Sequence, residues 1–332
     1  MRLYHLFISS ISLSTPSLAG PIPVSDSLSQ TIISNAGGGV PVGNSAIQLS
    51  DDGISGFQVA NFLENVEAAF FAAAQSNLTK DAAFTATPAK GLSISDTLTK
   101  IVAQEQVHVA TVENLLASNN ASTIPACTSI LPIGNNNDFL AKANVITSAS
   151  IGAVVSLSAA LAKSDPDAVS SVTPILSVES RHDAFFRISS SDVPNPNPFD
   201  TALSATYAYN IILSFVDTSS CPKLLPLPIL PALNITSPAL TAAAPSTPPT
   251  TISFTIGDTS AEKSAALFIG WLNQANAPVY TAATVMGGKG TADVPKGLTG
   301  MAFAALTNQS TGLTLDDLTS NTLAGPAAVL IS

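Results

Sequence analysis

Two histidines of this chain each follow a glutamate by three residues, in Glu105-Gln-Val-His108 and in Glu179-Ser-Arg-His182. Residues three apart lie on one face of a helix, so each pair would project a carboxylate and an imidazole in the same direction. A third segment carries two more glutamates, Glu64 and Glu67, again three apart. Carboxylates and imidazoles together suit Mn, Fe or Zn in mixed nitrogen and oxygen coordination. The spacing therefore predicts a metal site, provided that helices bring these segments together.

Helix bundles build such sites by aiming Glu-x-x-His pairs from two helices, and a glutamate from each of two others, at one interior point. A single Glu-x-x-His pair is more often a solvated helical pair, and a site that no longer binds metal is the alternative interpretation. Two pairs that hold both histidines beyond the N-terminal segment favour the metal site.

The elements that must position these residues are predicted from apolar spacings of three and four, which indicate helices. We expect long helices over 54–76, 93–118, 138–163 and 165–189, and a shorter one over 199–216. Ser93 with Asp96 resembles a capping box, Asp138 is a good N-cap, and Asp165 before Pro166 resembles an N-cap with proline at the first helical position. Four long helices in series predict an all-α four-helix bundle.

The sequence changes character after the helices. Residues 222–250 are rich in proline and read as a semi-rigid linker. Three signals predict a small all-β sandwich-like domain. Residues 251–256 alternate with period two, residues 279–286 are rich in valine and threonine, and residues 301–306 and 327–331 are short apolar runs. The expected organisation is a signal peptide at 1–20, an extended segment at 21–52, a bundle at 53–221, the linker at 222–250 and a β-rich domain at 251–332.

Charge and hydropathy argue against nucleic acid binding and against a membrane span. The net charge is −10, and an acidic chain repels phosphate backbones, so we expect no nucleic acid partner. The best uncharged helical stretch, between Lys142 and Lys163, holds several serines, threonines and an asparagine. We expect it to be a buried bundle helix and predict no transmembrane segment.

Several features predict secretion. Leu3 to Leu18 is mostly apolar and hydroxylic, with a plausible cleavage site near Ala19 or Gly20. The only two cysteines, Cys127 and Cys221, predict one disulfide in an oxidising compartment, with two buried thiols as the alternative. Four sequons predict glycosylation at Asn77, Asn120, Asn234 and Asn308. The alternative is that the sequons arise by chance, because the chain is rich in serine and threonine.

The motifs resemble those of a known family. Leu63-Glu-Asn-Val-Glu-Ala-Ala-Phe-Phe71, Ala103-Gln-Glu-Gln-Val-His108 and Ser177-Val-Glu-Ser-Arg-His-Asp-Ala-Phe-Phe-Arg187 resemble the first, second and fourth bundle helices of fungal ferritin-like proteins, which include late-sexual-development and stress-responsive secreted proteins. Plant desiccation-related proteins are similar. The resemblance implies a ferritin-like bundle whose metal ligands are Glu67, Glu105, His108, Glu179 and His182, with Glu64 as second choice.

One departure from the family pattern affects the number of ions. The family has a glutamate on the third long helix, whereas residues 138–163 contain none. With three carboxylates and two imidazoles, we expect one tightly held Mn or Fe ion and a weak second position.

The resemblance and the composition lead to two alternative functions. The first is a secreted enzyme that uses Mn or Fe on peroxide or O2 during stress or development. The alternative is a non-catalytic glycoprotein of the extracellular space or cell wall, with a degenerate metal site.

Overall fold

The computed structural model describes residues 18–19, 28–42, 47–87, 91–130, 133–237, 250–264 and 266–331. Within these residues the chain divides into two compact units. The helical unit contains residues up to 194 and the segment 212–226, and the sheet unit contains 195–211 and the chain from 227 onwards. The predicted domain boundaries at 221 and 250 stay predictions. Almost all of the predicted signal peptide, and residues 238–249 of the predicted linker, lie outside the described residues.

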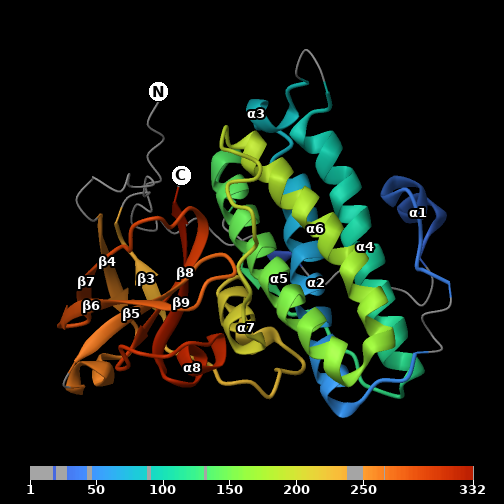
Figure 1. The fold of residues 1–332 in the computed structure, drawn as a ribbon. Helices are drawn as coiled ribbons and strands as arrows, with labels where there is room; N and C mark the ends of the chain where they lie inside the picture. Colours follow the sequence, from blue (N-terminus) through green and yellow to red (C-terminus); the bar gives the residue numbers. More distant parts are fainter. Residues whose placement is uncertain are drawn as a thin grey trace. The chain divides into compact units, whose positions relative to one another are not determined.

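The helical unit is built on four long helices (Figure 1). They are α2 (Asp51–Asn77), α4 (Ile94–Ser118), α5 (Asn136–Ser164) and α6 (Val169–Ser189). Each contacts two others, because α2 packs against α4 and α5, and α6 packs against the same two helices. The predicted four-helix bundle is confirmed. Shorter elements of this unit are α1 (Gln30–Ala36), α3 (Ala82–Thr85), a 3-10 turn (Pro166–Ala168), and the two-residue strands β1 (Leu18–Ala19) and β2 (Ser129–Ile130). Helix α1 lies in the segment that we expected to be extended.

Side chains at the N-terminal ends set where the long helices begin. Ser93 and Asp96 form the predicted capping box at the start of α4. The prediction for α5 was wrong by one turn, because Asn135 is its N-cap and accepts a hydrogen bond from the amide of Asp138. Asp138 therefore lies in the first turn, where its negative charge favours the positive end of the helix dipole.

Asp165 supports the start of a different helix from the one that it was predicted to cap. It precedes Pro166 but caps no amide of the helical segment that follows. Its carboxylate instead accepts hydrogen bonds from the amide of Ser50, at 2.5 Å, and from the Ser50 hydroxyl, at 2.7 Å. Ser50 is the N-cap of α2, so Asp165 joins the end of α5 to the start of α2.

Along the bundle axis, apolar layers lie on both sides of the layer that contains the glutamates and histidines. On α2, Phe57 belongs to one apolar cluster with Leu115, Val154 and Val172. Beyond Glu64 and Glu67 along the same helix, Phe70 and Phe71 pack against Phe139 and Phe186. The glutamates and histidines of the two motifs occupy the level between these layers. Such surroundings have a low dielectric response, which strengthens electrostatic interactions at that level.

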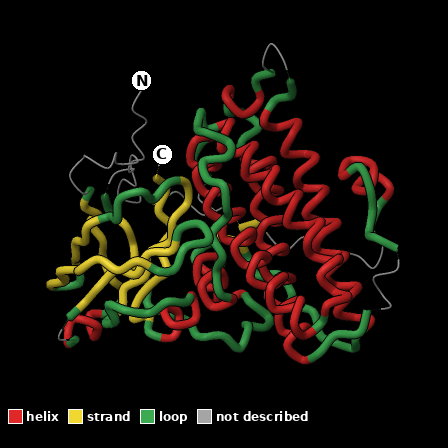
Figure 2. Tube along the Cα trace, in the orientation of Figure 1, coloured by secondary structure: helices red, strands yellow, loops and turns green. Residues whose placement is uncertain are grey.

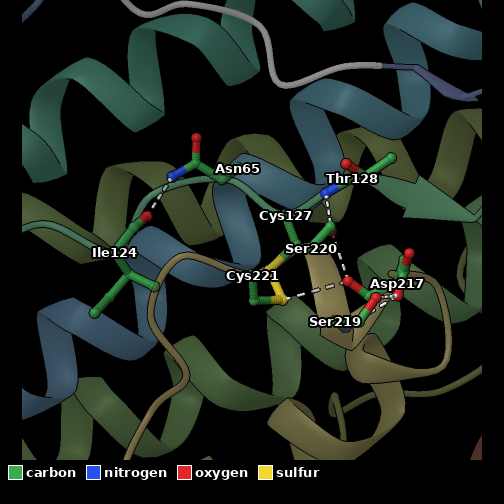
Figure 3. Close-up of a disulfide and its surroundings, with 8 residues drawn as sticks. All are labelled: Asn65, Ile124, Cys127, Thr128, Asp217, Ser219, Ser220 and Cys221. Carbon is green, nitrogen blue, oxygen red and sulfur yellow. Dashed lines mark hydrogen bonds between the residues drawn. A yellow bond between two sulfur atoms is a disulfide. The ribbon is translucent and has the colours of Figure 1, made fainter.

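The segment 212–226 returns to the helical unit and is covalently attached there. Cys127 and Cys221 form the predicted disulfide, with their Cα atoms 4.4 Å apart (Figure 3). Ser220 reinforces the junction, because its hydroxyl accepts a hydrogen bond from the amide of Thr128. The helix predicted over 199–216 is shorter, α7 (Ala205–Leu213). Residues beyond it pair instead with the β2 region, through a bridge between Ser129 and Val216.

The sheet unit is one seven-stranded antiparallel sheet, coloured yellow in Figure 2. Its strand order is β3-β4-β7-β6-β5-β8-β9. The strands are β3 (Leu233–Ile235), β4 (Thr251–Ile256), β5 (Leu267–Leu272), β6 (Val279–Met286), β7 (Lys289–Asp293), β8 (Gly300–Thr307) and β9 (Thr322–Ile331). The unit also contains a 3-10 turn (Thr259–Lys263) and α8 (Leu315–Ser320). The two edge strands contact each other, and the amide of Gly325 in β9 donates to the carbonyl of Pro231 just before β3. The expected all-β domain is therefore present, as a single sheet that is nearly barrel-like.

Among the described residues, α5 has the length and composition needed to cross a membrane, but half of its most apolar stretch is buried within the fold. The core helix of a bundle has this character, in agreement with the expectation for residues 142–163.

Candidate metal centre

Six ionisable side chains converge on the middle of the bundle. Helix α2 contributes Glu64 and Glu67, while α4 and α6 each contribute one Glu-x-x-His pair. We call these six residues the Glu/His cluster; it consists of Glu64, Glu67, Glu105, His108, Glu179 and His182. The three glutamates Glu67, Glu105 and Glu179 have no exposed surface, and His108, the most accessible member, is 7% exposed. Every metal ligand predicted from the sequence, including the second choice, therefore lies inside the protein.

His108 is surrounded by carboxylates from three helices. Its Nδ1 atom lies 3.4 Å from Glu64 Oε2, 3.3 Å from Glu105 Oε2 and 3.1 Å from Glu179 Oε1. One ligand atom from each of these four residues falls within 4.8 Å of the others. Nitrogen and oxygen atoms gathered in this way can hold one divalent ion.

His182 stands across the same two central carboxylates. Its Nδ1 atom lies 2.9 Å from Glu105 Oε1 and 3.5 Å from Glu179 Oε2. Each of these glutamates thus presents one oxygen to His108 and its other oxygen to His182. The two imidazole rings are 6.4 Å apart between centroids, on either side of the pair.

Glu67 is buried at the cluster without a strong partner. Among the described residues, no donor forms a well-formed hydrogen bond with either of its carboxylate oxygens. Burial raises the pKa of Glu67 well above 4.5, and the charges of Glu179, Glu105 and Glu64 raise it further, while the Ser150 hydroxyl on α5 lowers it. A buried carboxylate without compensation costs free energy, which a bound cation would offset.

The remaining pKa shifts come from mutual interactions within the cluster. Burial raises the pKa of Glu64 to about 8, although the charge of His108 opposes the rise. Burial alone would raise the pKa of Glu105, but hydrogen bonds from His108 and His182 lower it to about 2. Burial would lower the pKa of both imidazoles, yet carboxylates overcome it, raising His182 to about 10 and His108 well above 6.5. Protons thus balance part of the negative charge here, in positions that a metal ion could take.

Helix α5 supplies hydroxyls where the resemblance leads one to expect a carboxylate. Thr147 and Ser150 are buried, and neither hydroxyl oxygen has a well-formed hydrogen bond within the described part of the chain. No charged side chain of α5 therefore takes the place of the glutamate that this helix lacks.

Gln104 also contacts the cluster, although no motif in the sequence singles it out. Gln104 Oε1 lies 2.8 Å from Nε2 of His182, on the side of the ring opposite to the carboxylates. Glutamine is common on helices, and only its position directly before Glu105 could have drawn attention to it.

Comparison with known proteins agrees with the geometry. No curated protein matches the chain by sequence. A family model described as the ferritin-like domain matches residues 53–191, which contain all six residues of the Glu/His cluster and all of the four long helices except the first two residues of α2. Residues 53–191 of this chain are therefore a ferritin-like domain.

Proposed function

We propose that the Glu/His cluster binds two divalent ions, Mn or Fe, and that the protein uses them on peroxide or O2. The observation that carries the proposal is the arrangement of Glu105 and Glu179, each with one oxygen towards His108 and one towards His182. In this arrangement both carboxylates could be shared by two ions, and the imidazoles would be end ligands.

Charge supports two ions over the single ion expected from the sequence. That expectation counted three carboxylates, because Glu64 was only a second choice. Both Glu64 and Glu67 are buried at the cluster, so four carboxylates are available. Their four negative charges equal the charge of two divalent ions, and the missing glutamate of α5 leaves no deficit. We therefore propose Glu64 as a ligand beside His108 and Glu67 as the fourth carboxylate.

A redox-active metal would supply electron exchange with peroxide or O2 when bound. The chain's own residues would bind it and exclude bulk water, because apolar layers close both sides of the cluster.

Metal analysis of the purified full chain tests this proposal. After loading with Mn²⁺, or with Fe²⁺ under anaerobic conditions, we expect elemental mass spectrometry to find about two ions per chain. The loaded protein should also decompose peroxide or consume O2. A His108→Ala, His182→Ala double variant should lose both. Glu262→Gln is the matched control, since Glu262 lies in the sheet unit and accepts hydrogen bonds from Gly287 and Gly288.

The alternative is a non-catalytic extracellular or cell-wall glycoprotein with a degenerate site. The hydroxyls of Thr147 and Ser150, in place of a carboxylate on α5, favour it. Absence of metal from the loaded wild-type chain, with unchanged folding of the double variant, would support this function and exclude the first.

Secretion is part of both proposals. All four sequon asparagines, Asn77, Asn120, Asn234 and Asn308, are exposed on the surface, where a glycan can be attached. The disulfide also suits an oxidising compartment. The resemblance to fungal stress-responsive and developmental proteins supports a role in those processes. Expression in a eukaryotic secretory host, followed by endoglycosidase digestion, tests secretion and glycosylation. We expect the protein in the medium and a fall in its mass on digestion.

A further inference from the structure

His182 is held from both sides. Its Nδ1 atom faces Glu105 and Glu179, while its Nε2 atom lies 2.8 Å from Gln104 Oε1. An amide oxygen can only accept a hydrogen bond, so the Nε2 atom must carry the hydrogen. Nδ1 is then the ring atom that can bind a cation inside the cluster, once the cation has displaced the proton shared with the carboxylates.

The other end of the Gln104 amide is also engaged. Its Nε2 atom donates to the backbone carbonyl of Ala36, at 3.3 Å. Ala36 is the last residue of α1, and the last carbonyls of a helix have no partner within that helix. Gly37, with a φ of 84°, ends α1 there, and Lys100 Nζ donates to the neighbouring carbonyl of Asn35. The end of α1 is thus attached to α4 through two side chains one turn apart.

The two ends of an amide are not equivalent, so this attachment has a chemical consequence. Because the carbonyl of Ala36 can only accept, it requires the NH2 end of Gln104 and leaves the oxygen end for His182. A reversed amide would present a donor to His182, which would favour the ring form with hydrogen on Nδ1. That form cannot bind a metal through Nδ1.

We propose that Gln104 is a positioning residue for metal binding, and that the C-terminal end of α1 fixes the direction of its amide. The proposal rests on the proposed function, since it concerns how one ligand of the Glu/His cluster is oriented. No described residue makes a corresponding hydrogen bond to Nε2 of His108, so α1 acts on one imidazole of the pair.

The test compares Zn²⁺ affinities of the full-length protein and two variants, measured by competition with a chromophoric chelator. Loss of an outer hydrogen-bond partner of a ligating imidazole weakens metal binding by about 10- to 100-fold. We expect Gln104→Leu to weaken Zn²⁺ binding by that amount. Gln104→Glu should remain within a few-fold of wild type, because both carboxylate oxygens accept and no fixed direction is needed. Gln58→Leu is the matched control; Gln58 lies on α2 and its amide donates to the carbonyl of Ser122.

A second readout separates positioning from a packing role. In the Zn²⁺-loaded wild type, nitrogen NMR of the His182 ring should show a slowly exchanging hydrogen on Nε2. Gln104→Leu should make this hydrogen exchange rapidly, while the helical circular dichroism is unchanged.

Wild-type affinity in Gln104→Leu, or equal losses in Gln104→Leu and Gln104→Glu, would overturn the role of Gln104 and leave the metal site standing. Failure of the wild-type chain to bind Zn²⁺, Mn²⁺ or Fe²⁺ would overturn both proposals.

Discussion

The metal-free protein should lose stability as the pH rises from 7 to 8. Glu64 has a pKa of about 8 in the folded chain and His182 about 10, against ordinary values of 4.5 and 6.5. Both groups therefore keep protons in the folded state that they have lost in the unfolded state. The stability that these protons contribute is complete below the unfolded pKa values and is lost as the pH rises through the folded ones.

The magnitude follows from the number of protons. One proton of difference changes the free energy of unfolding by about 1.4 kcal/mol per pH unit, so the protons of Glu64 and His182 together give at most about 2.8 kcal/mol. Glu67 and His108, whose pKa values are also raised, act in the same direction. Glu105 adds nothing, because its pKa is lowered to about 2 and it is ionised in both states. We expect a fall of at least about 2 kcal/mol between pH 7 and pH 8.

Urea unfolding in the presence of a chelator measures this, with the helices followed by circular dichroism at 222 nm. Trp271, the only tryptophan, is buried in the sheet unit and provides an internal control by fluorescence, since that unit holds no member of the Glu/His cluster. Metal-loaded protein should show the opposite slope, because bound metal requires deprotonated ligands. A helical transition that is independent of pH, or that moves to higher urea at pH 8 without metal, would refute the reasoning.

Three further predictions concern the framework of the helical unit, and all are measured by the same helical urea transition. Cys127→Ser should lower the free energy of unfolding by about 2 to 5 kcal/mol, because the disulfide to Cys221 closes a loop of 94 residues; an unchanged midpoint would show that the bond is not formed. Asp165→Ala should cost about 1 to 3 kcal/mol, since it removes a charged acceptor from the amide and hydroxyl of Ser50. Gly53→Ala should destabilise by about 1 kcal/mol or more although alanine favours helices, because its Cβ would lie 2.6 Å from Asp165 Oδ2; a more stable variant would mean that Asp165 moves aside freely.

Local chemistry in the sequence was sufficient to predict the bundle. Apolar spacing identified the four long helices, and the capping box at Ser93 and Asp96 placed the start of α4. Two Glu-x-x-His pairs identified the inward faces of α4 and α6, because three-residue spacing determines which side chains share a helix face. Alternating residues likewise identified β4, and enrichment in valine and threonine identified β6.

Other elements depend on contacts between distant residues. Strand β5 is a continuous apolar run, which has no strand-like alternation because both of its faces are buried. The 3-residue strand β3 lies in the predicted linker and exists through its pairing with β4. Asn135 displaced Asp138 as the cap of α5, since either residue type can cap and only the chain path decides between them.

The sequence by itself determined which side chains could bind metal and which helix faces carry them. Only the tertiary structure decided that Glu64 joins Glu67 at the cluster, and that Glu105 and Glu179 stand between the two imidazoles. It also decided that Gln104 joins His182 to the end of α1. Helical periodicity sets the direction of a side chain on its own helix, but the distance between side chains of different helices depends on how the helices pack.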